Sequence, residues 1–120
     1  QEYKDLTNND MHVINAIGVG TTKNMSSIAK ELSVTVGTLT ISMNSLVKKG
    51  YVTRCRSMQD RRVVHISLSE KGVKAYYHHK HFHEQMIQGV VEVLTEEELQ
   101  ALIKALTKLN SWFRSFDKDE

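Results

Sequence analysis

Two stretches in the middle of the chain carry apolar residues at helical spacing. In residues 26–32 and 35–49, hydrophobic side chains recur at intervals of three and four, which is typical of amphipathic helices. Ser33 and Val34 separate the two stretches, and Gly50 ends the second. The residues expected in the core are Ile28, Ala29 and Leu32 from the first helix and Val36, Leu39, Met43, Leu46 and Val47 from the second.

After Gly50 the pattern changes to the alternation that is typical of strands. Residues 51–54 and 63–68 are the two predicted strands, and the short basic loop 56–62 joins them. The order helix, turn, helix and hairpin predicts a winged helix-turn-helix, in which the second helix enters the major groove of DNA.

Three further helices are predicted around this motif. A capping box at Thr7 and Asp10 begins a helix that reaches about residue 17. A long helix is expected over residues 70–93, and a second capping box at residues 95–98 begins the last helix. The predicted fold class is therefore mostly α, with a small β-hairpin wing and long helices that form a dimerisation region.

The last helix carries a stripe of leucine and phenylalanine at alternating spacings of three and four, the pattern of a coiled coil or helix bundle. A single domain would leave part of this stripe exposed, and exposed apolar patches of this kind mark interfaces. We therefore expect a homodimer. The stripe consists of Leu99, Leu102, Leu106, Leu109, Phe113 and Phe116.

Composition is consistent with one domain that does not enter a membrane. The chain has 120 residues, 40% of them hydrophobic, with no apolar run of membrane-spanning length and no apolar leader at its N-terminus. Cys55 is the single cysteine, which fits a reducing, cytoplasmic location. Because Arg54 and Arg56 flank it, two interpretations stay open, a small structural side chain or an oxidation-sensitive thiol.

The charge of the chain is unevenly distributed, although its net charge is only +2. Residues 48–62 hold six basic residues against Asp60 alone, whereas residues 91–120 hold four basic and seven acidic residues. A basic patch in the hairpin of such a motif indicates phosphate binding, although a solvated surface cluster has the same composition.

Two other classes of protein are alternatives to a DNA-binding regulator. An enzyme is not expected, because the chain has no Gly-rich phosphate loop and no nucleophile–base motif. A winged helix that binds only other proteins is the second alternative. The salt dependence of duplex binding separates it from a DNA reader, whose affinity falls steeply as salt rises.

The face of residues 35–49 opposite the predicted core supplies the candidate DNA contacts. Gly37 is costly within a helix, which suggests a close approach to the duplex, and Ile41 suits a thymine methyl group. A plain glycine near a turn and an ordinary exposed hydrophobe are the alternatives. Arginine at a hairpin tip suits a narrow minor groove. The candidate DNA-binding residues are Thr35, Gly37, Thr38, Ile41, Asn44, Ser45, Lys48, Arg56 and Arg61.

Three runs of residues in this region match the signatures of a known family. They are Val34-Thr35-x-Gly37-Thr38-Leu39-Thr40, Leu46-x-x-Lys49-Gly50-Tyr51-Val52 and Ser57-x-x-Asp60-Arg61-Arg62-Val63-Val64. Together they resemble the MarR family of bacterial transcription regulators. The resemblance implies a homodimeric winged-helix repressor that binds a pseudo-palindromic operator in double-stranded DNA.

The same resemblance implies roles for other parts of the chain. Asp60 and Arg62 would form an ion pair in the wing. Residues 1–120 would form one domain, with a DNA-binding lobe at about 21–70 and dimerisation helices at about 1–17 and 71–118, of which the N-terminal helix is incomplete.

The histidines are the candidates for an effector site. His79 and His83 are four residues apart on one predicted helix, so both imidazoles point the same way and could chelate a metal. The chain resembles a zinc-sensing branch of the family. The zinc ligands of that branch lie at positions that match His12, His79 and His83. Met11 stands where that branch has an acidic residue.

The runs at 10–14, 34–40 and 60–64 resemble a second branch, the repressors of fatty-acid synthesis in Gram-positive bacteria. Those repressors respond to acyl chains carried on acyl carrier protein, and the same histidines would then line or adjoin an acyl pocket. The effector expected from this likeness is acyl–acyl carrier protein, with zinc and neither ligand as the open alternatives. No cofactor is expected to be required.

Overall fold

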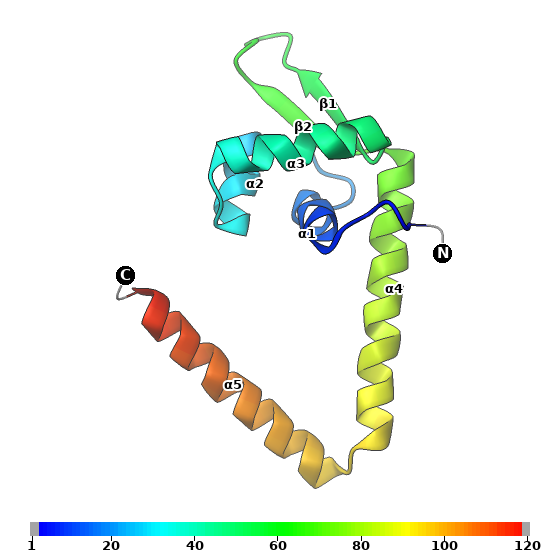
Figure 1. The fold of residues 1–120 in the computed structure, drawn as a ribbon, viewed down its shortest axis with the longest axis vertical. Helices are drawn as coiled ribbons and strands as arrows, with labels where there is room; N and C mark the ends of the chain where they lie inside the picture. The colour runs from blue at the N-terminus through cyan, green and yellow to red at the C-terminus, as the bar shows by residue number, and fades with distance from the viewer. Residues whose placement is uncertain (1–2, 119–120) are drawn as a thin grey trace. The chain divides into compact units, whose positions relative to one another are not determined.

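The structure is a computed structural model that describes residues 3–118 (Figure 1). Over these residues it contains helices and one antiparallel hairpin, so the predicted fold of mostly α structure with a β wing is confirmed. The elements are α1 (Asn8–Ile17), α2 (Met25–Leu32), α3 (Val36–Lys49), β1 (Val52–Arg56), β2 (Val64–Leu68), α4 (Glu70–Val93) and α5 (Glu96–Lys118).

Side-chain caps fix where most of these helices begin. The Thr7 hydroxyl accepts a hydrogen bond from the backbone N–H of Asp10, whose carboxylate accepts one from the N–H of Thr7, a complete capping box. The same exchange between Thr95 and Glu98 begins α5. The backbone N–H of Thr95 lowers the pKa of Glu98, because a carboxylate that accepts a hydrogen bond is favoured in its charged form.

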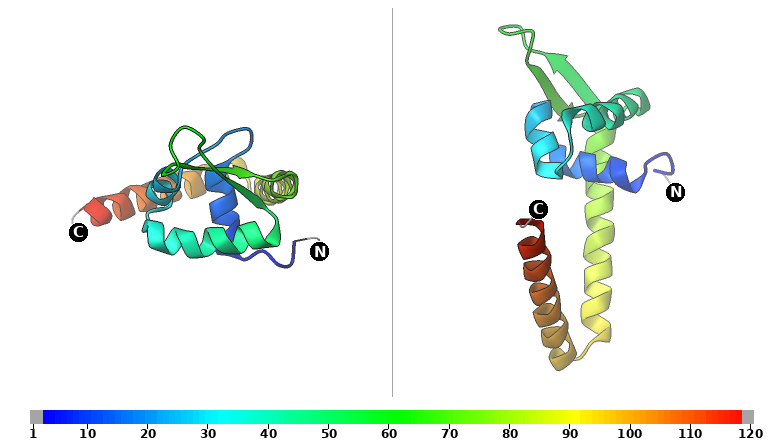
Figure 2. Two further views of the ribbon diagram at one scale, coloured as in Figure 1. Left: turned by 90° about the horizontal axis from the view of Figure 1, so that it is seen from above. Right: turned by 60° about the vertical axis from the view of Figure 1, so that its left-hand side comes forward.

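The wing is a hairpin in which β1 and β2 pair from Val52 opposite Leu68 to Arg56 opposite Val64 (Figure 2). The first strand therefore starts one residue later than predicted and includes Arg56, which the sequence assigned to the loop. Lys23, ahead of α2, forms a short bridge to Ile66, with backbone bonds of 2.9 Å and 2.7 Å. Because these two bonds pair backbone groups of Ile66 with the segment ahead of α2, the bridge connects the wing to the helices.

The hydrophobic core is built mainly from α1, α2, α3 and the base of the hairpin. Val36, which the sequence placed in the core, is 45% exposed. It occupies the first turn of α3, before that helix packs against its neighbours, so its burial was wrongly predicted. The largest fully buried side chains are Val13, Ile14, Ile17, Ile28, Leu39, Met43, Leu46, Tyr51 and Ile66.

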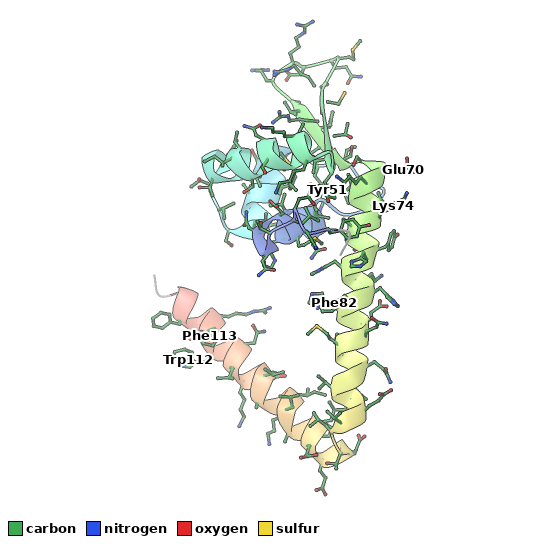
Figure 3. The ribbon with its side chains drawn as sticks, turned by 45° about the vertical axis from the view of Figure 1, so that its right-hand side comes forward. Tyr51, Glu70, Lys74, Phe82, Trp112 and Phe113 are labelled. Atoms are coloured by element: carbon green, nitrogen blue, oxygen red, sulfur yellow. The ribbon has the colours of Figure 1, made fainter. Side chains whose placement is uncertain are left out.

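Tyr51 joins the end of α3 to α4 and to the N-terminal segment (Figure 3). Its hydroxyl donates a 2.7 Å hydrogen bond to the Asp5 carboxylate, and the Lys71 ammonium lies 4.3 Å from its ring centroid. Burial, and then the bond to Asp5, raise the pKa of Tyr51 well above its ordinary value. The hydroxyl therefore stays protonated and keeps donating.

The contacts within the chain divide it into two units, Gln1–His81 and Phe82–Glu120. The boundary lies inside α4. The sequence grouped α1 with the dimerisation helices, but α1 packs against α2, α3 and β2 in the first unit. Its apolar side chains, including Ile14 and Ile17, fill the core under the helix-turn-helix, so α1 is a structural part of that lobe.

In the second unit, α5 exposes one apolar face. Within this chain Leu106, Leu109, Phe113 and Phe116 are each more than half exposed, and Leu99 is half-buried. Trp112 stacks on Phe116, with ring centroids 5.6 Å apart, and extends the apolar face (Figure 3). No helix within residues 3–118 has the length and apolar character needed to cross a membrane.

Candidate DNA-binding surface

The N-terminus of α3 is held by two threonines that remain exposed. The Thr35 hydroxyl accepts a 3.1 Å hydrogen bond from the Thr38 N–H and donates one to the Thr38 hydroxyl at 2.9 Å. A Cβ built on Gly37 would approach nothing within the chain closer than the Thr35 hydroxyl at 3.9 Å. Packing inside the chain therefore does not require glycine at this position, and the role of Gly37 in a close approach to DNA stays a prediction.

The predicted contact residues lie along that outer surface. Thr38, Asn44 and Lys48 are exposed, Ser45 is half-buried, and Ile41 is 75% exposed. An apolar side chain so open to water on a polar face suits a contact with another apolar group, such as a thymine methyl. The structure therefore brings the candidates of α3 onto one face.

One hydrogen bond connects this face to the wing. The Arg54 guanidinium, from β1, donates through Nη1 to Oδ1 of Asn44 at 2.5 Å. The side chains of Arg54 and Arg56 point to the side of the hairpin that faces α2 and α3, where they line a cavity of about 370 Å³. Arg54 was not predicted from the sequence as a DNA-binding residue; the period-two alternation of the strand indicates that it shares a side of the hairpin with Arg56 but not that this side meets α3.

The loop between the strands is shaped by Asp60. Its carboxylate accepts hydrogen bonds from the Arg62 backbone at 3.0 Å and from the Arg62 guanidinium at 3.1 and 3.2 Å. These bonds hold the pKa of Asp60 below its ordinary value, because they favour the charged carboxylate. The ion pair expected from the family resemblance is thus present in the chain, and it fixes the turn at the tip of the wing.

Two arginines of the wing that were predicted to contact DNA differ in their surroundings. The Arg56 guanidinium donates to the backbone carbonyl of Arg61 at 2.6 Å, so it braces the loop from the strand side. Arg61 itself is exposed on the loop. Both arginines are exposed, and they differ in that Arg56 also supports the loop through its bond to the Arg61 carbonyl.

Two of the six basic residues in 48–62 pair with carboxylates, so the basic surface is smaller than the sequence suggests. Lys49 turns inward and contacts the buried Asp10 carboxylate at 2.9 Å. Arg62 pairs with Asp60. Among the described residues, no carboxylate forms an ion pair with Lys48, Arg54, Arg56 or Arg61, so these four carry the positive charge of the surface.

The histidines do not form a metal site in this structure. His12 is exposed and lines a groove between α1, α2 and α3, whereas His79 and His83 belong to α4. No group of three or more His, Cys, Asp or Glu side chains among the described residues is placed to hold a metal ion. The boundary between the two units falls between His79 and His83, so a shared effector or metal role for His12, His79 and His83 stays a prediction.

Cys55 is exposed on the outer face of the hairpin, directly opposite His65 in the strand register. It is not a core residue, which removes the structural interpretation offered by the sequence. Its Sγ contacts only the Arg56 carbonyl among the hydrogen bonds found over residues 3–118, at 3.8 Å.

Comparison with known proteins agrees with this geometry. Residues 1–78 match the model of a family described as transcriptional regulator SarA/Rot. An uncharacterised HTH-type transcriptional regulator of Bacillus subtilis, YpoP, is 28% identical over 107 residues, which are 89% of this chain and 76% of YpoP. SarZ of Staphylococcus saprophyticus is 41% identical over 68 residues, 57% of this chain and 47% of SarZ.

Solved structures with this fold include proteins bound to DNA. Streptococcus pneumoniae FabT in complex with DNA is 40% identical, with a TM-score of 0.87, over 97% of this chain and 81% of that chain. A mutant of MarR from E. coli, complexed with operator DNA, is 28% identical, with a TM-score of 0.68, over 88% of this chain and 76% of that chain. Both likenesses extend beyond the residues matched by the family model.

Proposed function

The chain belongs to the SarA/Rot family of transcriptional regulators, and we propose that it is a homodimeric repressor that binds a pseudo-palindromic operator. The observation that carries the proposal is the shared surface of α3 and the wing, joined by the hydrogen bond from Arg54 to Asn44. On such a surface α3 reads the major groove, and the basic loop at 57–63 reaches the neighbouring minor groove. The DNA-bound FabT structure supports this placement by likeness.

The dimer is proposed from the apolar face of α5. A two-fold symmetric dimer presents two copies of α3, and each copy reads one half-site, so the symmetry of the protein is repeated in its operator. Such a regulator works where the chromosome is, in the cytoplasm of a bacterium.

The central experiment separates phosphate contacts from base contacts. The operator is first selected from a random duplex library, and affinity is then measured over a range of salt concentrations. Arg61→Ala should weaken binding to all duplexes and reduce the slope of log affinity against log salt by roughly 0.9. Asn44→Ala should instead change the discrimination between operators. Unchanged affinity and salt slope in Arg61→Ala would refute the role of the wing.

The proposal also names the regulated genes and the effector. The likeness to FabT at 40% identity supports control of fatty-acid synthesis genes, with long-chain acyl–acyl carrier protein as the effector. Zinc is the weaker candidate, since the described residues of one chain offer no cluster of ligands for it.

The effector is tested by operator affinity in four conditions. They are micromolar zinc, a chelator, unacylated carrier protein and carrier protein loaded with a long acyl chain. We expect only the last to change operator affinity. Strong dependence on zinc without a response to the acyl chain would reverse the assignment.

A further inference from the structure

The geometry points to Arg54 as a positioning residue that sets the base preference of Asn44; this inference rests on the proposed function, because it concerns how α3 reads DNA. Arg54 lies in β1, and Asn44 lies on the exposed face of α3. The bond between them, from Nη1 to Oδ1, measures 2.5 Å. It joins the wing to the helix at the residue best suited to read a base edge.

The chemistry of the asparagine amide explains how this bond can orient the Asn44 side chain. An amide side chain has an acceptor oxygen and a donor NH₂ group at opposite corners, and a free asparagine can present either to a ligand by rotating. A guanidinium is a donor only. Because Arg54 engages the oxygen, it holds the amide in one orientation, with the oxygen toward the wing and the NH₂ group away from it.

The held orientation selects among bases. In the major groove, guanine offers the acceptors N7 and O6, adenine offers the acceptor N7 beside its N6 amino donor, and thymine offers the acceptor O4, whereas cytosine offers only the N4 amino donor. An NH₂ group directed at the groove binds an acceptor and opposes the cytosine donor. The inferred effect of Arg54 is therefore discrimination against cytosine at the base that Asn44 meets.

Two other features favour positioning over direct contact. The Arg54 side chain lines the cavity of Met25, Thr40 and Val64, on the side of the hairpin that faces the helices. The alternation of the strand turns Thr53 and Cys55 to the opposite side. Arg54 is exposed like Arg61, but its guanidinium is directed at α3 and contacts Asn44, whereas Arg61 lies on the loop at the tip of the wing.

The test compares Arg54→Met, Arg54→Lys, Asn44→Ala and the double variant Arg54→Met/Asn44→Ala. Methionine removes the donors and keeps an unbranched stem for the cavity. Lysine keeps the charge but loses the planar guanidinium fork. Affinity is measured for four duplexes that differ only at the base pair whose identity matters less to Asn44→Ala than to wild type. Thermal unfolding of each variant confirms that it folds.

We expect Arg54→Met and Arg54→Lys to reduce discrimination against cytosine by about two- to tenfold, the lower part of the range for coupled neighbouring residues. In the Asn44→Ala background, Arg54→Met should produce no further loss of discrimination. The salt slope should be unchanged in Arg54→Lys.

Three results would overturn the inference. The first is a uniform loss of affinity for all four duplexes with a smaller salt slope in Arg54→Met, which identifies a phosphate contact. The second is a loss of discrimination in the double variant that exceeds that of Asn44→Ala. The third is the absence of sequence-dependent binding by wild type, which would also refute the proposed function. The first two results would leave that function intact.

Discussion

The Lys49 ammonium lies 2.9 Å from the Asp10 carboxylate and joins the last turn of α3 to the first turn of α1. Asp10 is only 5% exposed, and it also caps its own helix through the N–H of Thr7. Lys49 donates in addition to the backbone carbonyl of Asp5. One lysine thus holds three segments together, whereas its neighbour Lys48 is exposed on the outer face of α3.

We predict opposite effects for these adjacent lysines. Lys49→Met leaves a buried carboxylate without its cation and should lower the free energy of unfolding by about 1–3 kcal/mol. Lys48→Met should change it by less than about 0.5 kcal/mol but should weaken DNA binding and reduce the salt slope. Urea unfolding and salt-dependent DNA binding measure the two effects. Equal stability of both variants would show that the contact with Asp10 contributes nothing.

Gly72 in α4 is predicted to tolerate no side chain. A Cβ at this position would lie 2.0 Å from the Tyr51 carbonyl oxygen, and that backbone cannot move without displacing the base of the wing. Gly72→Ala should therefore lower the free energy of unfolding by about 3 kcal/mol, at the upper end for overpacking.

Gly89, in the same helix, is the matched control. A Cβ there meets nothing within 4 Å in the chain, so Gly89→Ala should raise helix stability by about 0.5–1 kcal/mol. Both variants are compared by urea unfolding under the same conditions. A destabilisation of similar size at both positions would indicate a general effect on α4 rather than the contact with Tyr51.

The elements could be predicted well from the sequence because their ends are determined by residues close to them in the chain. The capping boxes at Thr7 and Thr95, the cap at Thr35 and the glycine at position 50 each act within one turn of a helix. The hairpin followed from alternation and a basic loop. Such signals depend on few neighbours, so they can be read without knowledge of the fold.

What the sequence did not predict depends on packing between distant segments. Val36 fits the apolar period of α3, yet its turn extends past the core. His12 lines a groove with residues of α2 and α3, a neighbourhood that the helical period of α1 does not reveal. The bond from Arg54 to Asn44 requires a strand to lie across a helix. Periodicity gives the face of one element, not the neighbour that the face meets.

The wing ion pair gives a prediction about pH. Hydrogen bonds from Arg62 lower the pKa of Asp60 from 3.8, so the pair is intact above that value and is lost as pH falls through the lowered pKa. The loop should keep its shape throughout the neutral range. An NMR titration of the Asp60 carboxyl should have its midpoint below 3.8, and Arg62→Met should return the midpoint toward 3.8. A midpoint unaffected by Arg62→Met would mean that the pair does not form in solution.

The apolar face of α5 gives the last prediction. Leu106 and Phe113 are 55% and 57% exposed in the single chain, a cost that a second copy would remove by covering them. Leu106→Glu would place a charge in that interface and leave it without water. The dissociation constant of the dimer, measured by analytical ultracentrifugation, should rise by about thirtyfold, which corresponds to about 2 kcal/mol.

Ser111→Glu is the control, since it adds the same charge on the opposite side of α5 and should leave the dimer intact. Operator binding should weaken in Leu106→Glu alone, because two half-sites need two linked copies of α3. A wild-type protein that stays monomeric at micromolar concentration, or a Leu106→Glu variant that dimerises normally, would show that the stripe is covered by something other than a second copy.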